Sequence, residues 1–558
     1  AYLVLYAAEP RAEIVDLAPA LSPGEHTAVI EATGGWGQWA LERVIVRGDA
    51  LPARPWLPGA LAVLALLPAA GAWRALQRGE GARAFAVLVA LVDQLDRQAA
   101  RVPASVQTTL AVADYAWDWG SPPLAVGLGL LVAGAPSGLV RLAALLALAV
   151  VLWFRLDLLP ALIPLYLPFY LHPLSLLGRP FSAPELGVAL GTAILATRWV
   201  LAWGARRTPW RVACAGDGPV AALAALAILA TLAAAEREVA LRELRVVIIE
   251  PALFYLLVTR GAAAVGRPSR VWPTLDGFVI GAVLASLLGL SQLVTRADLI
   301  EAEGVWRVRA LYGSPNNLAL YLDRALPVIL AIALWGGGWR RWLYGVAVLP
   351  VAAACFLTFS KGAWFLGIPI AIVTLALIGI WQARREGRPW RRAALVTLAA
   401  LAVMALALVP FLGTERFARL ADFSSGTGFF RLRLWQSAWQ MALDHPWLGV
   451  GPDNFLYQYR SRYVLPDAWG ELNLSHPHNI VLDLWTRLGI GGVVVGAWLL
   501  IVVARLAWRA LQRQGTVSPV AAGLLASAAA AAAHGLIDNS LFLVDLGFVW
   551  MMTLGALA

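Results

Sequence analysis

The sequence predicts an all-α polytopic membrane protein with about 12–15 transmembrane helices and a large helical extracytoplasmic loop. Hydrophobic residues make up 60% of the 558 positions, charged residues only 14%, and the mean hydropathy is +0.71. Soluble domains carry roughly 25% charged residues, so a soluble fold of this size would lack a charged surface. Apolar stretches of about 17–25 residues also recur, which is the length that a bilayer-spanning helix needs.

Residues 1–50 differ from the rest of the chain. Short β-prone runs at 28–30 and 44–46 are separated by glycines, which predicts a short β-rich extracytoplasmic segment, suited to the tail of a larger domain. Trp36 and Trp39 lie between these runs. Tryptophans can stack on sugar rings, but core and membrane-interface positions are commoner for them.

Apolar segments follow one another after Pro58, and their lengths define the predicted helices. These are 57–74, 82–92, 123–154 (one or two helices), 157–172, 184–203, 219–235, 246–260, 275–294, 318–336, 342–359, 362–381, 394–412, 479–504, 519–537 and 539–556. Prolines interrupt the region 80–180, which is typical of a kinked or re-entrant segment sheltered by other helices. The predicted organisation is transmembrane helices over 57–412 and 479–558, separated by an extracytoplasmic loop over 413–478.

Clusters of arginine predict the orientation, because cytoplasmic loops carry an excess of positive residues. The clusters are Arg206, Arg207 and Arg211; Arg260, Arg267 and Arg270; Arg340 and Arg341; Arg384, Arg385, Arg388, Arg391 and Arg392; and Arg505, Arg509 and Arg513. They fall on alternate connections from about residue 200 onward, and this pattern accounts for the net charge of +10 without nucleic acid. The connections predicted to face outward are 236–245, 295–317, 360–361, 413–478 and the turn near 538.

The two cysteines, Cys214 and Cys355, lie far apart in or beside apolar segments. This placement predicts two free thiols rather than a disulfide framework. The chain begins at Ala1 and ends within an apolar run, which is compatible with a fragment of a longer protein.

Unusual polar residues gather on the predicted outward side, where a charge at the membrane boundary marks a functional candidate. They are Arg309, Asn316, Asn317, Lys361, Arg431, Arg433, Asp453, Asn454, His476, His478, Asn479, His534, Asp538 and Asn539.

Several of these candidates also have a purely structural interpretation. Arg309 and Lys361 can extend to lipid head groups. Asn316 can cap the helix that follows it. Arg431 and Arg433 lie in a segment whose apolar residues recur at helical spacing, as in an interfacial amphipathic helix.

Taken together, cations and a histidine on one membrane face favour group transfer from a lipid diphosphate to a hydroxyl. Guanidinium and ammonium groups neutralise phosphate oxygens, and an imidazole can accept the proton of a sugar hydroxyl. Paired carboxylates with metal-ligand spacing are missing from the sequence, and His476 and His478 at i, i+2 do not match an i, i+4 zinc pair. We therefore expect no metal and no cofactor.

Four motifs resemble those of the bacterial O-antigen ligase and polymerase superfamily. In chain order they are Gly313-Ser314-Pro315-Asn316-Asn317 after Arg309, similar to "G-x-x-N-N-x-A"; Leu357 to Trp364, similar to "T-x-S-R-G-A"; His445 to Phe455, similar to "P-x-x-G-x-G-x-x-N-F"; and His478-Asn479 followed by Gly489-Ile490-Gly491-Gly492. The resemblance extends over about residues 270–558.

The resemblance implies a metal-independent, inverting membrane glycosyltransferase of the cytoplasmic membrane with its active site in an extracytoplasmic loop. It implies that His478 is the general base and that Arg309 and Lys361 hold the diphosphate of an undecaprenyl-linked glycan. Arg431, Arg433, Asn316, Asn317 and Asn479 are further candidates for substrate binding. The chain has Lys361 where the family usually has arginine, and lysine keeps the charge without the bidentate fork.

The favoured function is ligation of a glycan from a polyprenyl diphosphate to a hydroxyl on a lipid, a protein or another glycan. A repeat-unit polymerase of the same superfamily is the first alternative. A transporter or flippase of lipid-linked sugars is the second, although it predicts an internal repeat and polar residues at the bilayer midplane. A sugar sensor built on residues 1–50 is a remote third. Membrane lipid is an expected partner and nucleic acid is not.

Overall fold

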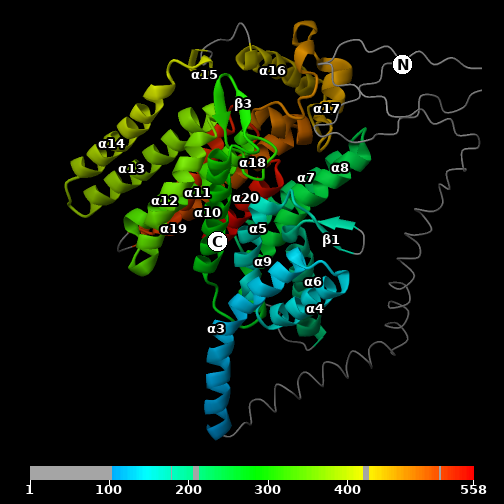
Figure 1. The fold of residues 1–558 in the computed structure, drawn as a ribbon. Helices are drawn as coiled ribbons and strands as arrows, with labels where there is room; N and C mark the ends of the chain where they lie inside the picture. The colour runs from blue at the N-terminus through cyan, green and yellow to red at the C-terminus, as the bar shows by residue number, and fades with distance from the viewer. Residues whose placement is uncertain (1–103, 177–178, 205–212, 419–425, 514–516) are drawn as a thin grey trace, which may run out of the picture. The chain divides into compact units, whose positions relative to one another are not determined.

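The computed structural model describes residues 104–558 apart from 177–178, 205–212, 419–425 and 514–516. This part of the chain is a bundle of helices with two small β-hairpins (Figure 1). The β-rich segment predicted over 1–50 and the helices predicted over 57–74 and 82–92 lie outside the described residues, so they stay predictions.

The described helices and strands follow the apolar segments of the sequence closely. The helices are α3 (Ala104–Gly134), α4 (Gly138–Phe154), α5 (Leu159–Tyr166), α6 (Ala183–Gly204), α7 (Asp217–Ala233), α8 (Arg237–Glu243), α9 (Glu250–Ala264), α10 (Val271–Thr295), α11 (Pro315–Trp335), α12 (Gly338–Leu357), α13 (Ile368–Arg385), α14 (Arg391–Leu408), α15 (Glu415–Ala418), α16 (Gly426–Asp444), α17 (Phe455–Gln458), α18 (Ile480–Gln512), α19 (Pro519–His534) and α20 (Val544–Leu557). Strand β1 (Leu174–Leu176) pairs antiparallel with β2 (Arg179–Phe181), and β3 (Ile300–Ala302) with β4 (Val305–Arg307).

Eight of the described helical segments are long and apolar enough to cross a membrane. A ninth is formed if Gly138–Phe154 and Leu156–Phe169, which meet at 102°, count as one broken span or re-entrant loop. This bend falls in the proline-rich region for which a kinked or re-entrant segment was predicted. Three further apolar helices, α7, α19 and α20, are shorter, with 17, 16 and 14 residues. The protein is therefore a multi-pass membrane protein.

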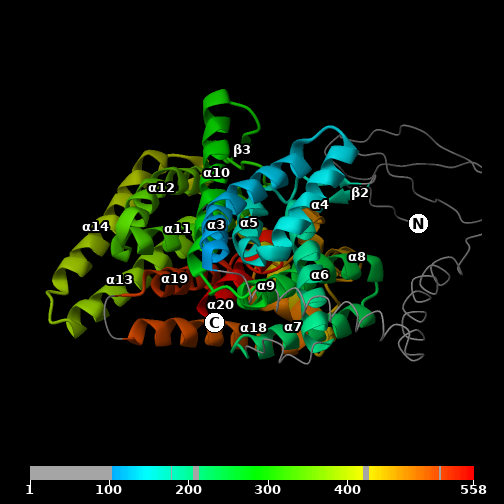
Figure 2. The same cartoon turned by 90° about the horizontal axis from the view of Figure 1, so that it is seen from below.

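Helix α11 lies at the centre of the described bundle and packs against α12 and α19. Its most apolar window is 78% buried, whereas that of α14 is only 6% buried. Figure 2 shows α13 and α14 at the outside of the bundle, away from α9 and α20. Side chains of α14 are therefore left for contact with lipid.

One predicted connection is wrong. Residues 236–245 were expected to form an outward loop, but α8 continues through a π-helical segment (Leu244–Ile249) directly into α9. The charges in this segment suggested a loop because buried charges are costly when unpaired. Glu243 is buried, yet it accepts hydrogen bonds from the guanidinium of Arg487 in α18. This pairing lets the helix continue.

Candidate active site

The loop over 445–455 docks on a kink in α18. Gly489 has a φ of 71°, a left-handed conformation that interrupts the helix. The interruption frees backbone groups of α18 for the loop. The N–H of Val450 donates to the carbonyl of Thr486 at 2.7 Å, and the N–H of Ile490 donates to the carbonyl of Pro446 at 2.8 Å. Two motifs that are separate in the sequence are therefore joined by backbone hydrogen bonds.

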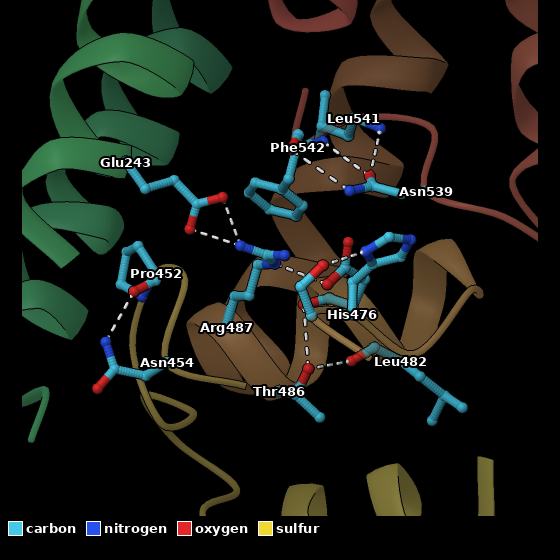
Figure 3. A network of polar contacts seen from close by, with 12 residues as sticks. Glu243, Pro452, Asn454, His476, Leu482, Thr486, Arg487, Asn539, Leu541 and Phe542 are labelled. Atoms are coloured by element: carbon cyan, nitrogen blue, oxygen red, sulfur yellow. Dashed lines mark hydrogen bonds and ion pairs between the residues drawn. The ribbon is translucent and has the colours of Figure 1, made fainter. Parts of the chain in front are cut away.

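Asn454 fastens the other end of this loop. Its side-chain N–H₂ donates to the carbonyls of Pro452 and Glu236, and its side-chain oxygen accepts from the N–H of Glu236 at 2.8 Å. Figure 3 shows the loop residues Pro452 and Asn454 beside the buried pair of Glu243 and Arg487. The asparagine of this motif holds the loop against the turn between α7 and α8.

His478 stands at the start of α18 and faces a carboxylate from the α19–α20 loop. Its Nδ1 lies 2.8 Å from Oδ1 of Asp538. With the carboxylate at Nδ1, the neutral imidazole carries its proton on that nitrogen and leaves Nε2 as the basic atom. The φ of His478 is 48°, which is uncommon for a non-glycine residue, and such conformations cluster at functional sites.

Backbone contacts fix the two segments that carry this pair. The N–H of Ile480 donates to the carbonyl of Gly535 at 2.6 Å. Asn479 caps α18 by accepting from the N–H groups of Val481 and Leu482, and its N–H₂ donates to the carbonyl of Leu536 at 3.0 Å. Both the oxygen and the nitrogen of the Asn479 side-chain amide therefore form hydrogen bonds that hold the start of α18 against the α19–α20 loop.

Charges around Asp538 are set by two histidines. Burial alone would raise the pKa of this carboxyl, but the neighbouring His478, which is hydrogen-bonded to it, and the nearby His476 hold the pKa of Asp538 well below its usual range. Burial and the neighbouring His478 lower the pKa of His476. At neutral pH Asp538 is therefore an anion, and His476 is uncharged.

His476, His478 and Asp538 are also the described residues that could hold a metal ion, since their ligand atoms lie within 4.8 Å of one another. Two ligands of a tetrahedral zinc ion lie roughly 3.3 Å apart, given bonds of about 2.0 Å. The 2.8 Å between His478 and Asp538 is shorter and is a hydrogen-bond distance. His476 lies 3.8 Å from the same carboxylate oxygen. This geometry fits a hydrogen-bonded pair better than a metal centre.

A second group of side chains begins at the β3–β4 hairpin. Arg307, at the end of β4, is buried; its Nε donates to the carbonyl of Thr358 at 2.7 Å and its other N–H to the side chain of Asn316 at 2.6 Å. Burial and the nearby Arg416 lower the pKa of Arg307 to about 9, while Glu303 and Asp538 act in the opposite direction. Arg307 thus links the hairpin, the start of α11 and the end of α12.

Lys361 and Arg416 meet at one carboxylate. The Nζ of Lys361 lies 3.5 Å from Oε2 of Glu303, and a guanidinium nitrogen of Arg416 lies 2.7 Å from the same oxygen. Burial lowers the pKa of Lys361 and of Arg416, and the positive charge of Arg431 contributes to lowering both. We call Arg307, Lys361, Arg416 and Arg431 the cation cluster.

The cation cluster and the His478–Asp538 pair act on one another electrostatically. The negative charge of Asp538 acts to raise the pKa of Arg307, and His478 and Arg431 both act to lower the pKa of Glu471. Figure 1 shows β3, α15 and α16 gathered at one end of the bundle. Through these shared partners, Lys361, Arg431, Asn316 and His478 belong to one network of charged and polar groups.

Other predicted site residues have different partners. Arg309 donates to the carbonyl of Asp298 at 3.2 Å and lies 3.8 Å from its carboxylate. Arg433 forms an ion pair with Asp467 at 2.7 Å. The backbone N–H of Asn317 donates to the side chain of Ser314, so Ser314, and not Asn316, caps α11. Asn316 instead accepts the hydrogen bond from Arg307.

Sequence reasoning missed three of these residues. Arg307 had a signal: Val305 and Arg307 are buried and Trp306 is exposed, which is the alternation of a strand that carries a charge on its inner side. Glu303 and Arg416 had none, because Arg416 reaches the hairpin from more than a hundred residues away.

Comparison with known proteins agrees with the region of the site. Residues 345–497 match the family model described as O-antigen ligase. The match begins in α12 and ends in α18, so it includes Lys361, Arg431 and His478 and leaves Arg307 and Asp538 on either side. The comparison with curated proteins found no match.

Proposed function

We propose that this chain, whose residues 345–497 match the O-antigen ligase family model, transfers a glycan from a polyprenyl diphosphate carrier to a hydroxyl group, with inversion and at the outer face of the cytoplasmic membrane. The observation that carries the proposal is the His478–Asp538 pair beside the cation cluster. A base and a set of cations are the two parts that such a transfer needs.

In the proposed reaction, Nε2 of His478 accepts the proton of the acceptor hydroxyl. The acceptor oxygen forms a bond to the anomeric carbon while the bond from that carbon to the diphosphate oxygen breaks. The electron pair of the broken bond leaves with the diphosphate. Asp538 keeps the imidazole in the required tautomer and stabilises the imidazolium that forms.

Lys361 and Arg431 are proposed to bind the departing diphosphate, together with Arg307. Arg307 is preferred to Arg309 because its guanidinium lies with Asn316 and Thr358 in the interior, whereas Arg309 lies with Asp298. Three cations around one place supply charge for the diphosphate, so the proposed reaction needs no divalent metal.

A transfer assay with purified protein, labelled donor and hydroxyl acceptor tests this proposal. His478→Ala should abolish transfer while the protein remains folded in the membrane. The exposed His172 gives a matched control, because His172→Ala removes an imidazole far from these loops in the sequence. Near-normal product from His478→Ala would exclude the base assignment. Loss of transfer in EDTA would exclude metal independence.

A deletion strain distinguishes the two reactions of the superfamily, ligation and polymerisation. A deletion strain that fails to attach finished glycan to its acceptor indicates a ligase, which is the favoured activity. A strain that accumulates single repeat units indicates a polymerase. Movement of labelled lipid across vesicles without any transfer product would instead indicate a transporter.

A further inference from the structure

The tip of the β3–β4 hairpin carries a carboxylate into the cation cluster. Glu303 and Gly304 form the turn and both have positive φ, 53° and 77°. Non-glycine residues avoid this region unless their surroundings impose it. The surroundings here are charged: the carbonyl of Glu303 accepts from the N–H of Arg416 at 3.2 Å, and its carboxylate bonds the guanidinium of the same residue.

Arg416 is built into this place rather than lying on a surface. Its side chain is mostly buried, and its Nε donates to the carbonyl of Phe359 at 2.8 Å. Phe359 precedes Ser360 and Lys361 and also has a positive φ, 50°. One guanidinium therefore ties the α15 segment to both the hairpin tip and the turn that presents Lys361.

Positive charges outnumber negative charges in the cation cluster and its partner Glu303. Lys361 and Arg416 share Glu303, while Arg307 and Arg431 add positive charge to the same cluster. Buried cations are stable only when they are paired. A carboxylate bonded to two of them keeps the cluster assembled, and the remaining positive charge favours a second or stronger anion.

We propose that Arg416 binds the donor's diphosphate together with Lys361, and that Glu303 occupies this binding position until the diphosphate replaces it. The inference rests on the proposed function and adds to it a binding residue and an exchange of anions. Lysine is a point charge, whereas the guanidinium of Arg416 offers the fork that matches two phosphate oxygens. The cations are paired before and after the exchange.

Binding of polyprenyl diphosphate to the detergent-solubilised full chain tests the exchange. Arg416→Gln should weaken binding by about tenfold or more, because a charge-assisted hydrogen bond is lost. Glu303→Gln should tighten binding several-fold, because the competing anion is removed. Glu301→Gln is the matched control: Glu301 is an exposed acid on the same hairpin, and its removal should leave binding unchanged.

The outcomes separate this inference from the proposed function. If the wild-type chain binds no polyprenyl diphosphate, the proposed function itself fails. If it binds, and Arg416→Gln binds equally well, the role of Arg416 is overturned. Weaker binding by Glu303→Gln would mean that the carboxylate positions the cations instead of competing with the ligand. Inorganic pyrophosphate, used as a second ligand, distinguishes recognition of the diphosphate from recognition of the lipid.

Stability measurements cover the case in which Glu303→Gln folds poorly. Removing the carboxylate leaves buried cations unpaired, so the variant should unfold at a lower temperature than the wild type. Inorganic pyrophosphate should restore its melting temperature and raise that of the wild type less. If pyrophosphate gives no recovery, Glu303 is a structural group that no anion replaces, and the proposal is wrong.

Discussion

Asp538 lies in the loop between α19 and α20, and two histidines approach its carboxylate from the start of α18. Its depressed pKa means that it remains charged at every pH at which such a transferase would work. A permanent anion at Nδ1 gives His478 a fixed orientation and a basic Nε2. The chemistry proposed for His478 therefore depends on a residue 60 positions away.

Asp538→Asn should lower the transfer rate by about 10²-fold, because the imidazole loses its orienting charge and its favoured tautomer. Donor binding should change little, since the cation cluster is intact. Steady-state kinetics with labelled donor give the rate, and direct binding of the donor gives the affinity. A parallel loss of donor affinity would show that Asp538 acts on the cations instead.

Lys361 makes donor binding sensitive to alkaline pH. Burial lowers the pKa of Lys361, so this side chain loses its proton and charge at a lower pH than an ordinary lysine. Donor affinity should therefore fall as the pH rises through that pKa. Lys361→Arg should retain its charge and extend tight binding to higher pH, as measured by donor titrations across the alkaline range. An unchanged pH limit in this variant would assign the titration to another group.

Among the elements, the kink of α18 has the clearest influence on the site. It exposes the carbonyl of Thr486 and the N–H of Ile490, and the 445–455 loop uses both. Asn479 caps the start of α18 and His478 directly precedes it, so the kink and the base lie on one continuous segment. Disturbing Gly489 should therefore affect the loop and the site together.

Gly489→Ala should lower the melting temperature of the purified protein and reduce transfer. A methyl group at this position would overlap the carbonyl of Trp447, and the backbone conformation of Gly489 (φ 71°, ψ −172°) costs a residue with a side chain about 1–3 kcal/mol. Gly345→Ala in α12 is the control, because nothing lies within 4 Å of the added carbon there. Equal melting temperatures for the two variants would contradict a structural role for the kink.

The sequence predicted elements well and long-range pairing poorly. Apolar length located α10 to α12, α14 and the start of α18 to within a few residues, because helices that face lipid must be continuous apolar segments. The connection predicted over 236–245 is wrong because the charge of Glu243 is paired with Arg487. Arg487 is far away in the sequence, so the residues around Glu243 give no sign of this pairing. A charged residue between apolar segments therefore predicts a loop only if no residue of opposite charge pairs with it inside the fold.

The residues of the candidate site likewise fall into those that the sequence predicted and those that it did not. His478, Lys361 and Arg431 stood in recognisable motifs or amphipathic segments, and the structure places them at one end of the bundle. Arg416 and Glu303 stood in no motif, since their relation to Lys361 exists only after the hairpin and α15 meet. Residue type and spacing predict which groups are available, but not which of them become neighbours.

At the scale of the whole molecule, the loops that carry the site share one end of the helical bundle. The hairpin, the α12 end and α15 are joined through Arg307, Arg416 and Lys361, and the start of α18 is joined to the α19–α20 loop through His478 and Asn479. Arginines of the predicted cytoplasmic clusters lie on other connections, among them Arg340 at the start of α12 and Arg388 after α13. The orientation predicted from these arginines stays a prediction.

Single cysteines should confirm this orientation. Cys214 and Cys355 are free thiols, as predicted, so they are first replaced in the test protein. Cysteines placed at the exposed positions Asp298 and Gln440 should react with a membrane-impermeant reagent in intact cells, and one at Arg388 only after permeabilisation. If the cysteines at positions 298 and 440 were labelled from opposite sides of the membrane, the proposed site would be wrong.

The distance in sequence between His478 and Asp538 has a consequence for biosynthesis. A ribosome delivers the imidazole before it delivers the carboxylate, because α18 and α19 lie between these two residues in the sequence. A nascent chain halted between these two residues can already hold the cation cluster but has no oriented imidazole. Such an intermediate should take up the lipid carrier without consuming it, so that competence for transfer arrives only with the α19–α20 loop.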